Sequence, residues 1–333
     1  MKRLLTVLTG VALASSAYGS AIIKTGDVYL GVNDLGNLNV SDPYGVTINS
    51  SYTGVTLGRI GDATSPGCLC EGWGVSGSGA SGYANEASGT AGLTLSSFAT
   101  DDVGAGPGTF ATSVVTLDGS TLTVTQHYAA AAAAPGALFA NSVTIKNTGA
   151  VAVTDVRYVR VMDWDIPPTE FREFVTIKGT ATTTQLELSH NDGFESGDPL
   201  AFSDEIFPGG TTDVDFEDVG PADHGAYFKF LFGDLEPGES QEFTIFYGGA
   251  NNEAAALAAL GAVGVELFSL GQSTNADGGP ANDAHTFIFG FKGVGGEIIV
   301  PPPRVPEGGT TLVLLGSVMG GLMMARRRFA VKA

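Results

Sequence analysis

The chain has few cationic residues, and this shortage narrows the classes of protein to which it can belong. It carries 16 Lys and Arg against 35 Asp and Glu, which gives a formal net charge of −19 over 333 residues. The excess of acidic residues is larger still in residues 22–303, which contain 9 basic and 34 acidic residues, because the basic clusters lie at the two ends. A surface this acidic repels phosphate backbones, so we expect no nucleic-acid partner.

Charged helix formers are scarce as well. Charged residues make up 15% of the chain, while Gly alone supplies 48 residues. This composition disfavours an ordinary helical enzyme, because Lys, Glu and Arg are among the residues that favour helix. With 43% hydrophobic residues the chain can still form a core, which excludes a long disordered chain. Residues 22–303 suffice for one large domain, or for two smaller ones that meet near residues 130–140.

Signature motifs of common catalytic classes are absent from the sequence. It contains no G-x-S-x-G, H-E-x-x-H or P-loop pattern. Residues 72–77 and 77–82 each match G-x-G-x-x-G, but a dinucleotide site needs a strand before that pattern and a helix after it. The flanks do not predict these elements, so glycine density explains the matches.

The chain has only two cysteines, Cys68 and Cys70, and two thiols do not complete a four-ligand zinc site. The N-terminal segment described below predicts export to an oxidising compartment. There, Gly67 and Gly72 would let the backbone bend enough for a disulfide between the two cysteines. In an extended strand the two side chains would point to opposite faces and could not bond. We therefore predict a local disulfide, with free or intermolecular thiols and metal ligation as the alternatives.

The first residues have the layout of a secretory signal. Lys2 and Arg3 form a charged start, residues 4–14 are apolar, and small residues follow through Ala21. The apolar run is too short for a membrane anchor. Residues 1–21 are therefore predicted to be a signal peptide that directs the chain to the secretion machinery.

An apolar, uncharged run lies near the C-terminal end. Residues 301–307 form a proline-rich spacer, residues 308–325 are uncharged, and Arg326-Arg327-Arg328 follow. Eighteen residues at about 1.5 Å each span roughly 27 Å, enough for a thin bilayer. The arginines would hold the extreme C-terminus in the cytoplasm. Residues 308–333 are therefore predicted to form a transmembrane helix and an Arg-rich tail, which makes the chain a single-pass membrane protein.

The tail begins with Val305-Pro306-Glu307-Gly308-Gly309. Together with the apolar run and the arginine cluster, this motif resembles the PEP-CTERM sorting signal of Gram-negative bacteria. Gly308 stands where that family usually has its second proline. The resemblance implies processing by an exosortase-type enzyme and a place in the cell envelope, on the surface or in the extracellular matrix. A plain C-terminal anchor is the alternative, and either case predicts attachment to the envelope.

Between the two ends, apolar residues recur with a period of two. Residues 113–124 predict a hairpin around Asp118-Gly119, and strands flank Asn147-Thr148-Gly149. One short helix is expected at about residues 252–261, capped by Asn252 and ended by Gly261. We therefore predict an all-β protein, a large antiparallel β-sandwich. Its largest Gly- and Asp-rich loops are expected at residues 58–92 and 191–223.

The stretch Asp163-Trp164-Asp165 ends a predicted strand, so its two carboxylates share one face. Carboxylates this close repel unless a cation, an arginine or a shared proton relieves them. Three interpretations stay open: an ion-pair network, a calcium site, and a glycosidase-type carboxylate pair. The arginines near in sequence are Arg157, Arg160 and Arg172.

Calcium is the only cofactor that the sequence indicates. Its predicted ligands are Asp163 and Asp165, with Asp192 and Asp198 from a turn-rich acidic loop. The catalytic alternative uses a different set. It consists of Asp163, Asp165, Glu170 and His224.

These observations predict an exported envelope or matrix protein with a structural, adhesive or ligand-binding role. Extracellular polysaccharide is the expected ligand. The alternative is an exported carbohydrate-active enzyme on the same sandwich. An enzyme should gather its acids in one open cleft, whereas a structural domain should scatter them or close them around a cation.

Overall fold

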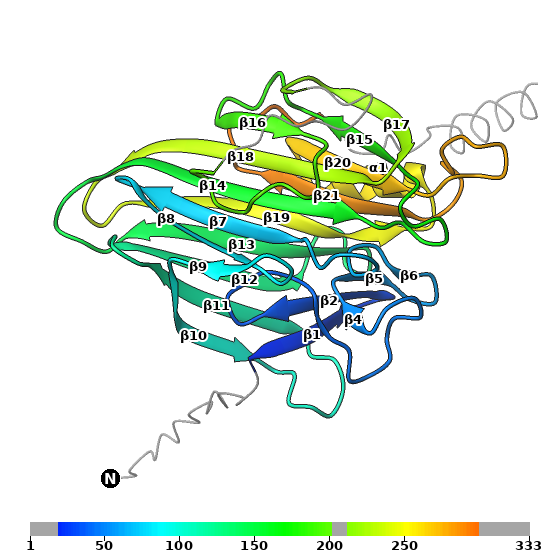
Figure 1. Cartoon of the computed structure of the whole chain (residues 1–333), viewed down its shortest axis with the longest axis horizontal. Coiled ribbons are helices and arrows are strands. Elements are labelled where there is room, and N and C mark those ends of the chain that lie inside the picture. The colour runs from blue at the N-terminus through cyan, green and yellow to red at the C-terminus, as the bar shows by residue number, and fades with distance from the viewer. Residues whose placement is uncertain (1–18, 202–211, 300–333) are drawn as a thin grey trace, which may run out of the picture. The chain divides into compact units, whose positions relative to one another are not determined.

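The computed structural model describes residues 19–201 and 212–299, which fold into antiparallel sheets with one helix (Figure 1). The predicted signal peptide, spacer, sorting motif and transmembrane helix lie outside these residues, apart from a few residues at their edges. Within the described ranges no helix is long and apolar enough to cross a membrane. The all-β sandwich prediction is confirmed by two large sheets that face each other.

The larger sheet has nine strands, and every neighbouring pair is antiparallel. The predicted hairpin around Asp118-Gly119 is present in it as the turn between β11 and β12. Residues 130–140 connect two paired strands of this sheet, β12 and β13. In spatial order the strands are β10 (Leu93–Thr100), β11 (Phe110–Leu117), β12 (Leu122–Ala130), β13 (Leu138–Asn147), β19 (Ser240–Ala250), β21 (Thr286–Lys292), β20 (Leu267–Gln272), β15 (Glu173–Lys178) and β17 (Phe216–Ala222).

The second large sheet has six strands and is also antiparallel. The turn at residues 148–152 crosses from β13 in the first sheet to β14 in the second. In spatial order the strands are β16 (Leu186–His190), β18 (His224–Leu235), β14 (Val153–Trp164), β7 (Gly72–Gly77), β8 (Ala80–Asn85) and β9 (Gly89–Ala91).

Two small sheets come from the N-terminal part of the described chain. One packs against the nine-stranded sheet through β11, β12 and β19, and the other packs against the first through β1 and β2. The first consists of β1 (Ser20–Thr25), β2 (Val28–Asn33), β5 (Val55–Leu57) and β6 (Gly61–Asp62). The second consists of β3 (Val40–Ser41) and β4 (Tyr52–Thr53).

Aromatic rings fill the space between the two large sheets. Phe228 of β18 contacts Phe289 and Phe291 of β21, with ring centroids 5.6 and 5.2 Å apart. Tyr158 of β14 meets the edge of Phe243 of β19 at 4.9 Å. The alternating aromatics of β21 therefore lie in the core, as their period of two predicts.

The helix α1 (Glu253–Val263) covers the other face of the nine-stranded sheet, where Leu260 packs in one cluster with Ile288. Asn252 caps it as predicted, and its side chain accepts a hydrogen bond from Ala255 N at 2.8 Å. The predicted end at Gly261 is wrong. The helix continues to Gly264, which adopts φ 68° and donates its N–H to the last carbonyls.

The expectation of one large loop at residues 58–92 is also wrong, because this segment forms β6 to β9. Several of its glycines serve close backbone contacts rather than flexibility. A Cβ atom on Gly74 would lie 2.0 Å from Gly197 O, and one on Gly82 would lie 2.4 Å from Gly92 O. Such contacts exclude any larger residue, so glycine here is compatible with strand.

Candidate functional site

Asp163 and Asp165 lie at the end of β14, where the strand leaves the six-stranded sheet. The alternation of the strand turns Trp164 away from them, and its Nε1 donates to Ser269 Oγ at 3.0 Å. Both aspartates are buried, with 1% and 0% of their surface exposed. The sequence prediction that the two carboxylates share one face is therefore confirmed.

Two further acids from distant segments join them. Asp223 lies between β17 and β18, and its carboxylate comes within 4.8 Å of those of Asp163 and Asp165. Glu173 begins β15 and is 0% exposed. Its charge acts on Asp165, as does that of Asp223. We call these four residues the acidic cluster.

The carboxyl oxygens of the cluster lack the hydrogen-bond donors that buried carboxylates usually have. Within the described chain, five of them are buried without a hydrogen-bond partner. They are Asp163 Oδ1, both Oδ atoms of Asp165, Glu173 Oε2 and Asp223 Oδ1.

Asp62 shows how the same fold satisfies a buried aspartate that stands alone. It is 0% exposed. Its Oδ2 accepts from Gly54 N at 2.7 Å, and its Oδ1 accepts from Thr64 N at 2.9 Å. The cluster has no such ring of donors, so the missing partners are a property of this site.

Arginine does not neutralise the cluster either. Arg157 pairs with Glu187 at 2.9 Å, and the buried Arg160 pairs with Glu71. Among the ion pairs formed by residues 19–201 and 212–299, none includes a residue of the acidic cluster. The interpretation of Asp163-Trp164-Asp165 as an ion-pair network therefore has no support in this geometry.

His224 adjoins the cluster but brings no positive charge to it. Its Nε2–H donates to the Glu173 carbonyl at 3.2 Å, and its Nδ1 accepts from Asn191 Nδ2 at 3.0 Å. Burial lowers the pKa of His224 to about 4, so the ring is neutral at physiological pH. With both ring nitrogens engaged, this histidine is a poor candidate for a catalytic base.

Burial and mutual repulsion displace the acid–base equilibria of the cluster. Burial, reinforced by repulsion from Asp163 and Glu173, raises the pKa of Asp165 to about 10. Burial also raises the pKa of Glu173 to about 9 and that of Asp163 well above its ordinary value. In the absence of a cation, these carboxyls would have to keep their protons to remain buried together.

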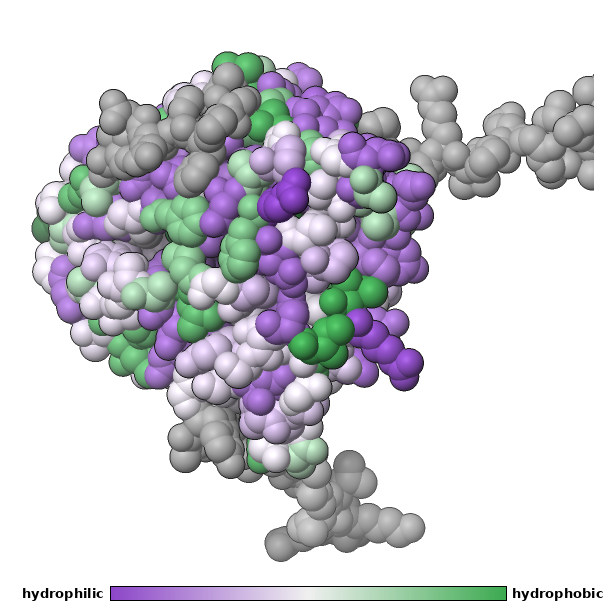
Figure 2. All heavy atoms as spheres, turned by 45° about the vertical axis from the view of Figure 1, so that its right-hand side comes forward, coloured by the Kyte–Doolittle hydropathy of each residue, from purple (hydrophilic) through white to green (hydrophobic). Residues whose placement is uncertain are grey.

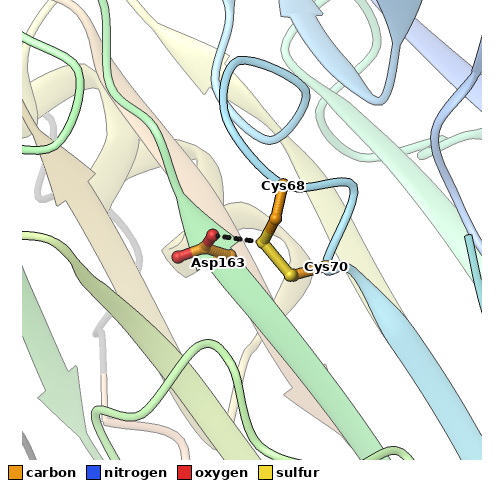
Figure 3. A group of neighbouring side chains, drawn as sticks. All are labelled: Cys68, Cys70 and Asp163. Carbon is orange, nitrogen blue, oxygen red and sulfur yellow. Dashed lines mark hydrogen bonds between the residues drawn. A yellow bond between two sulfur atoms is a disulfide. The ribbon is translucent and has the colours of Figure 1, made fainter. Parts of the chain in front are cut away.

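The Cys68–Cys70 disulfide lies directly beside the cluster, as Figure 3 shows, and joins Cα atoms 5.2 Å apart. Cys68 Sγ lies 3.1 Å from Asp163 Oδ2. A disulfide sulfur has no proton to donate, so this contact cannot compensate a negative charge. The preceding Gly67, with φ +80°, brings the loop backbone onto the site, since a Cβ there would lie 3.4 Å from Asp165 Oδ1.

The double variant Cys68→Ser/Cys70→Ser tests whether the sulfurs act as ligands. We expect the free energy of unfolding to fall by about 1–2 kcal/mol, because the disulfide closes only a very short loop. We expect any stabilisation by added calcium to persist, because hard cations bind oxygen in preference to sulfur. Chemical unfolding with and without calcium measures both effects. Loss of the calcium response in this variant would place the sulfurs or their loop in the cation site.

The other acids of the predicted sets are placed differently. Asp192 lies near enough to raise the pKa of Asp163 by repulsion, while its Oδ1 accepts from Phe194 N. Asp198 caps a turn by accepting from Leu200 N at 3.0 Å, and its charge is not among those that act on the cluster. The predicted metal set omits Glu173 and Asp223. The sequence showed both acids, but no local signal linked them to Asp163.

The geometry does not favour the enzymatic alternative. Asp163 and Asp165 are too deeply buried for a sugar to enter between them, whereas a glycosidase places its acids on either side of an accessible bond. Glu170 is engaged elsewhere, because its Oε1 accepts from Asn49 Nδ2 at 2.9 Å. The site is therefore best described as a largely buried, acidic, oxygen-lined site.

Comparisons with known proteins give information on the tail. Residues 304–329 match the VPDSG-CTERM motif. Val305, Pro306 and Gly309 agree with the letters of that name, and Glu307 keeps its acid. This family is akin to PEP-CTERM, so a C-terminal sorting motif is present, although the exact PEP-CTERM variant is not the one matched. A search of curated proteins found no match to the chain.

The class of protein follows from the sorting motif and the fold together. The chain is an exported, surface-associated protein whose tail implies processing by a sorting enzyme. The described part of the chain is an antiparallel β-sandwich with a buried acidic site.

Proposed function

We propose that this protein is a non-catalytic component of the cell surface or extracellular matrix, with a structural or adhesive role, whose sandwich is completed by a bound calcium ion. The observation that carries the proposal is the set of buried carboxyl oxygens without partners in the acidic cluster. Asp163, Asp165, Glu173 and Asp223 are the proposed ligands.

A cation accounts for the cluster better than protonation alone. Without a cation, the fold must either bury several negative charges together or hold protons on carboxyls far above their ordinary pKa. Both choices lower the free energy of unfolding at neutral pH. A divalent cation removes the repulsion and gives each unpartnered oxygen a ligand bond.

The donor set favours calcium over other metals. Asp163, Asp165 and Asp223 offer carboxylate oxygens within 4.8 Å of one another, and Glu173 adds an unpartnered oxygen whose charge acts on Asp165. Oxygen donors alone suit a hard cation with flexible coordination. Zinc prefers nitrogen and sulfur donors in a tetrahedral site, but both cysteines are bonded to each other. An exported protein also meets calcium at concentrations that extracellular modules of weak affinity can use.

The cation has a structural effect because its ligands come from three segments. Asp163 lies at the end of β14 of the six-stranded sheet and Asp165 directly follows it, while Glu173 begins β15 of the nine-stranded sheet. Asp223 lies in the connection from β17 to β18, which again joins the two sheets. A cation at the cluster therefore ties the two layers of the sandwich together at this end.

The sorting motif supports a role outside the cell. We propose that an exosortase-type enzyme processes the tail after export, and that residues 308–325 hold the chain in the membrane until then. The displayed domain would then remain on the surface or enter the extracellular matrix.

Thermal unfolding of the purified protein tests the proposed ion site. Calcium at 100 times its dissociation constant should add about 2.7 kcal/mol to the free energy of unfolding. For a domain of this size, this corresponds to a rise in Tm of about 4–6 °C over the value in chelator. Magnesium should raise the Tm less, because it demands a smaller octahedral site. An equal Tm in calcium and in chelator would contradict the proposal.

A further inference from the structure

A solvent-open cavity of about 570 Å³ lies outside the acidic cluster, among the loops of the N-terminal sheets. Its volume falls within the range of about 300–1,000 Å³ that is typical of small-ligand sites. The turns after β1 and β5 and the loop after β3 line most of it, and residues next to α1 and β21 complete it. The polar and aromatic side chains that line it belong to Asp27, Tyr29, Tyr44, Arg59, Asn251 and His285.

Tyr44 links this cavity to a second one. It lines both the first cavity and a neighbouring cavity of about 220 Å³, which also contains Pro43 and Asp102. One aromatic ring that borders two successive cavities is an arrangement suited to an elongated ligand with repeating units.

The fold holds the Tyr44 ring in place before any ligand arrives. Its hydroxyl donates to Oδ1 of Asp102, which is only 6% exposed, while Asp102 Oδ2 accepts from Ile22 N at 2.9 Å. Asp42 fixes the loop by accepting from Tyr44 N at 3.0 Å and from Thr47 N at 3.1 Å. An aromatic side chain that is already ordered loses little conformational entropy on binding.

The polar side chains of the cavity offer both hydrogen-bond donors and acceptors. Arg59 and Asn251 donate, Asp27 accepts, and His285 can do either. No hydrogen bond among the described residues engages the side chains of Asp27, Arg59 or Asn251, so they are available to a ligand. Aromatic rings beside such groups suit a pyranose, which has an apolar C–H face and a rim of hydroxyls.

Charge decides which kind of polysaccharide fits. Arg59 and Asp27 line the same cavity with opposite charges, and residues 22–303 carry 34 acidic against 9 basic residues. An anionic polymer would be repelled by this field. From these observations we infer that the groove formed by the two cavities at Tyr44 binds a neutral polysaccharide. The inference rests on the proposed adhesive role and names its ligand class.

The surface around the groove argues against a lipid or a broad apolar partner. Ile48 is 70% exposed, yet the cavity is otherwise lined by polar and aromatic groups as much as by aliphatic ones. On the face of the molecule drawn in Figure 2, hydrophobic residues likewise form small patches between hydrophilic ones. Docking onto a membrane would need a larger continuous apolar area.

Affinity electrophoresis of the purified protein tests this inference. The probes are soluble neutral glucan, mannan and galactan, with hyaluronan and dextran sulfate as anionic comparators. We expect at least one neutral polymer to retard the wild-type protein. Tyr44→Ala should weaken binding about tenfold, because the ring is the shared platform of both cavities. Tyr83→Ala on β8 is the matched control and should bind as wild type does.

The readouts separate this inference from the calcium site. Asn251→Ala should weaken binding with an unchanged Tm, whereas Asp165→Asn should abolish the calcium response and leave retardation intact. Retardation by anionic polymers alone would overturn the neutral-polysaccharide inference. So would the absence of any retardation, or equal loss of binding in Tyr83→Ala. Self-association that Ile48→Ser removes, without retardation, would instead show an interface between copies of the chain.

Discussion

Asp165→Asn should make the protein more stable than wild type in chelator, and this advantage should disappear in calcium. The pKa of Asp165 is raised to about 10, so at pH 8 the cation-free fold must hold a proton that the unfolded chain has released. Asparagine has nearly the same shape and no charge to bury. Each unit of pKa displacement is worth about 1.4 kcal/mol. Because the loops can relax and admit water, we expect a gain of about 2–3 kcal/mol in chelator.

In calcium the difference closes, because the variant has lost a ligand. The wild type gains about 2.7 kcal/mol at 100 times its dissociation constant, and the variant should gain little. Urea unfolding in both conditions measures the four free energies. Glu170→Gln is the control, since Glu170 is engaged with Asn49 and should respond to calcium as wild type does. A variant that is less stable than wild type in both conditions, with an unchanged calcium gain, would rule out the proposed role of Asp165.

The second large effect is a loss of stability as pH rises in chelator, which calcium should remove. In chelator, Asp165 and Glu173 keep protons up to pKa values of about 10 and 9, while the unfolded chain loses them near pH 4. The folded state then binds more protons than the unfolded state. Stability therefore falls as pH rises, by about 1.4 kcal/mol per pH unit for each retained proton.

Calcium should remove this loss, because the cation displaces the protons from the folded state. Its own affinity should rise with pH for the same reason. In calcium, stability should fall on the acid side, since burial lowers the pKa values of His190 and His224 to about 4 and no retained carboxyl proton opposes the loss. Their stabilising contribution is lost as pH drops below about 6.5, where the unfolded histidines take up protons. Unfolding free energies from pH 5 to pH 9.5 measure both limbs. Parallel curves with and without calcium would show that no protons are displaced.

Local sequence patterns predicted much of the fold. Alternation and the Asp118-Gly119 turn located the β11–β12 hairpin, and Asn252 located the start of α1. The helix end was missed because Gly261 lies inside the helix, buried against the sheet, while only Gly264 adopts the left-handed conformation. Propensity describes a residue alone and cannot show which glycine the sheet covers.

The strands within residues 58–92 were missed for a related reason. Glycine usually predicts a loop because of its flexibility. Here glycine is needed because a distant backbone atom leaves no room for a side chain, as Gly197 O does beside Gly74. This steric restriction exists only after the chain has folded. A single sequence does not show which glycines are restricted in this way.

The acidic site was half predictable. Asp163 and Asp165 could be predicted as a pair, because residues two positions apart on one strand lie on the same face. Glu173 and Asp223 reach them only through the packing of the two sheets, and their separation in sequence gives no local signal. Asp198 was expected among the ligands because its loop is acidic, but its carboxylate caps a turn instead.

The central claim is that the acidic cluster holds a cation, and calcium titration of the chelator-treated protein by isothermal calorimetry tests it most directly. At pH 7.5 we expect saturable binding of about one ion per chain, with proton release that scales with the ionisation heat of the buffer. The same titration of Asp165→Asn should give no binding, and Glu170→Gln should bind as wild type does. Absence of binding to the wild type, or equal binding to Asp165→Asn, would contradict the account.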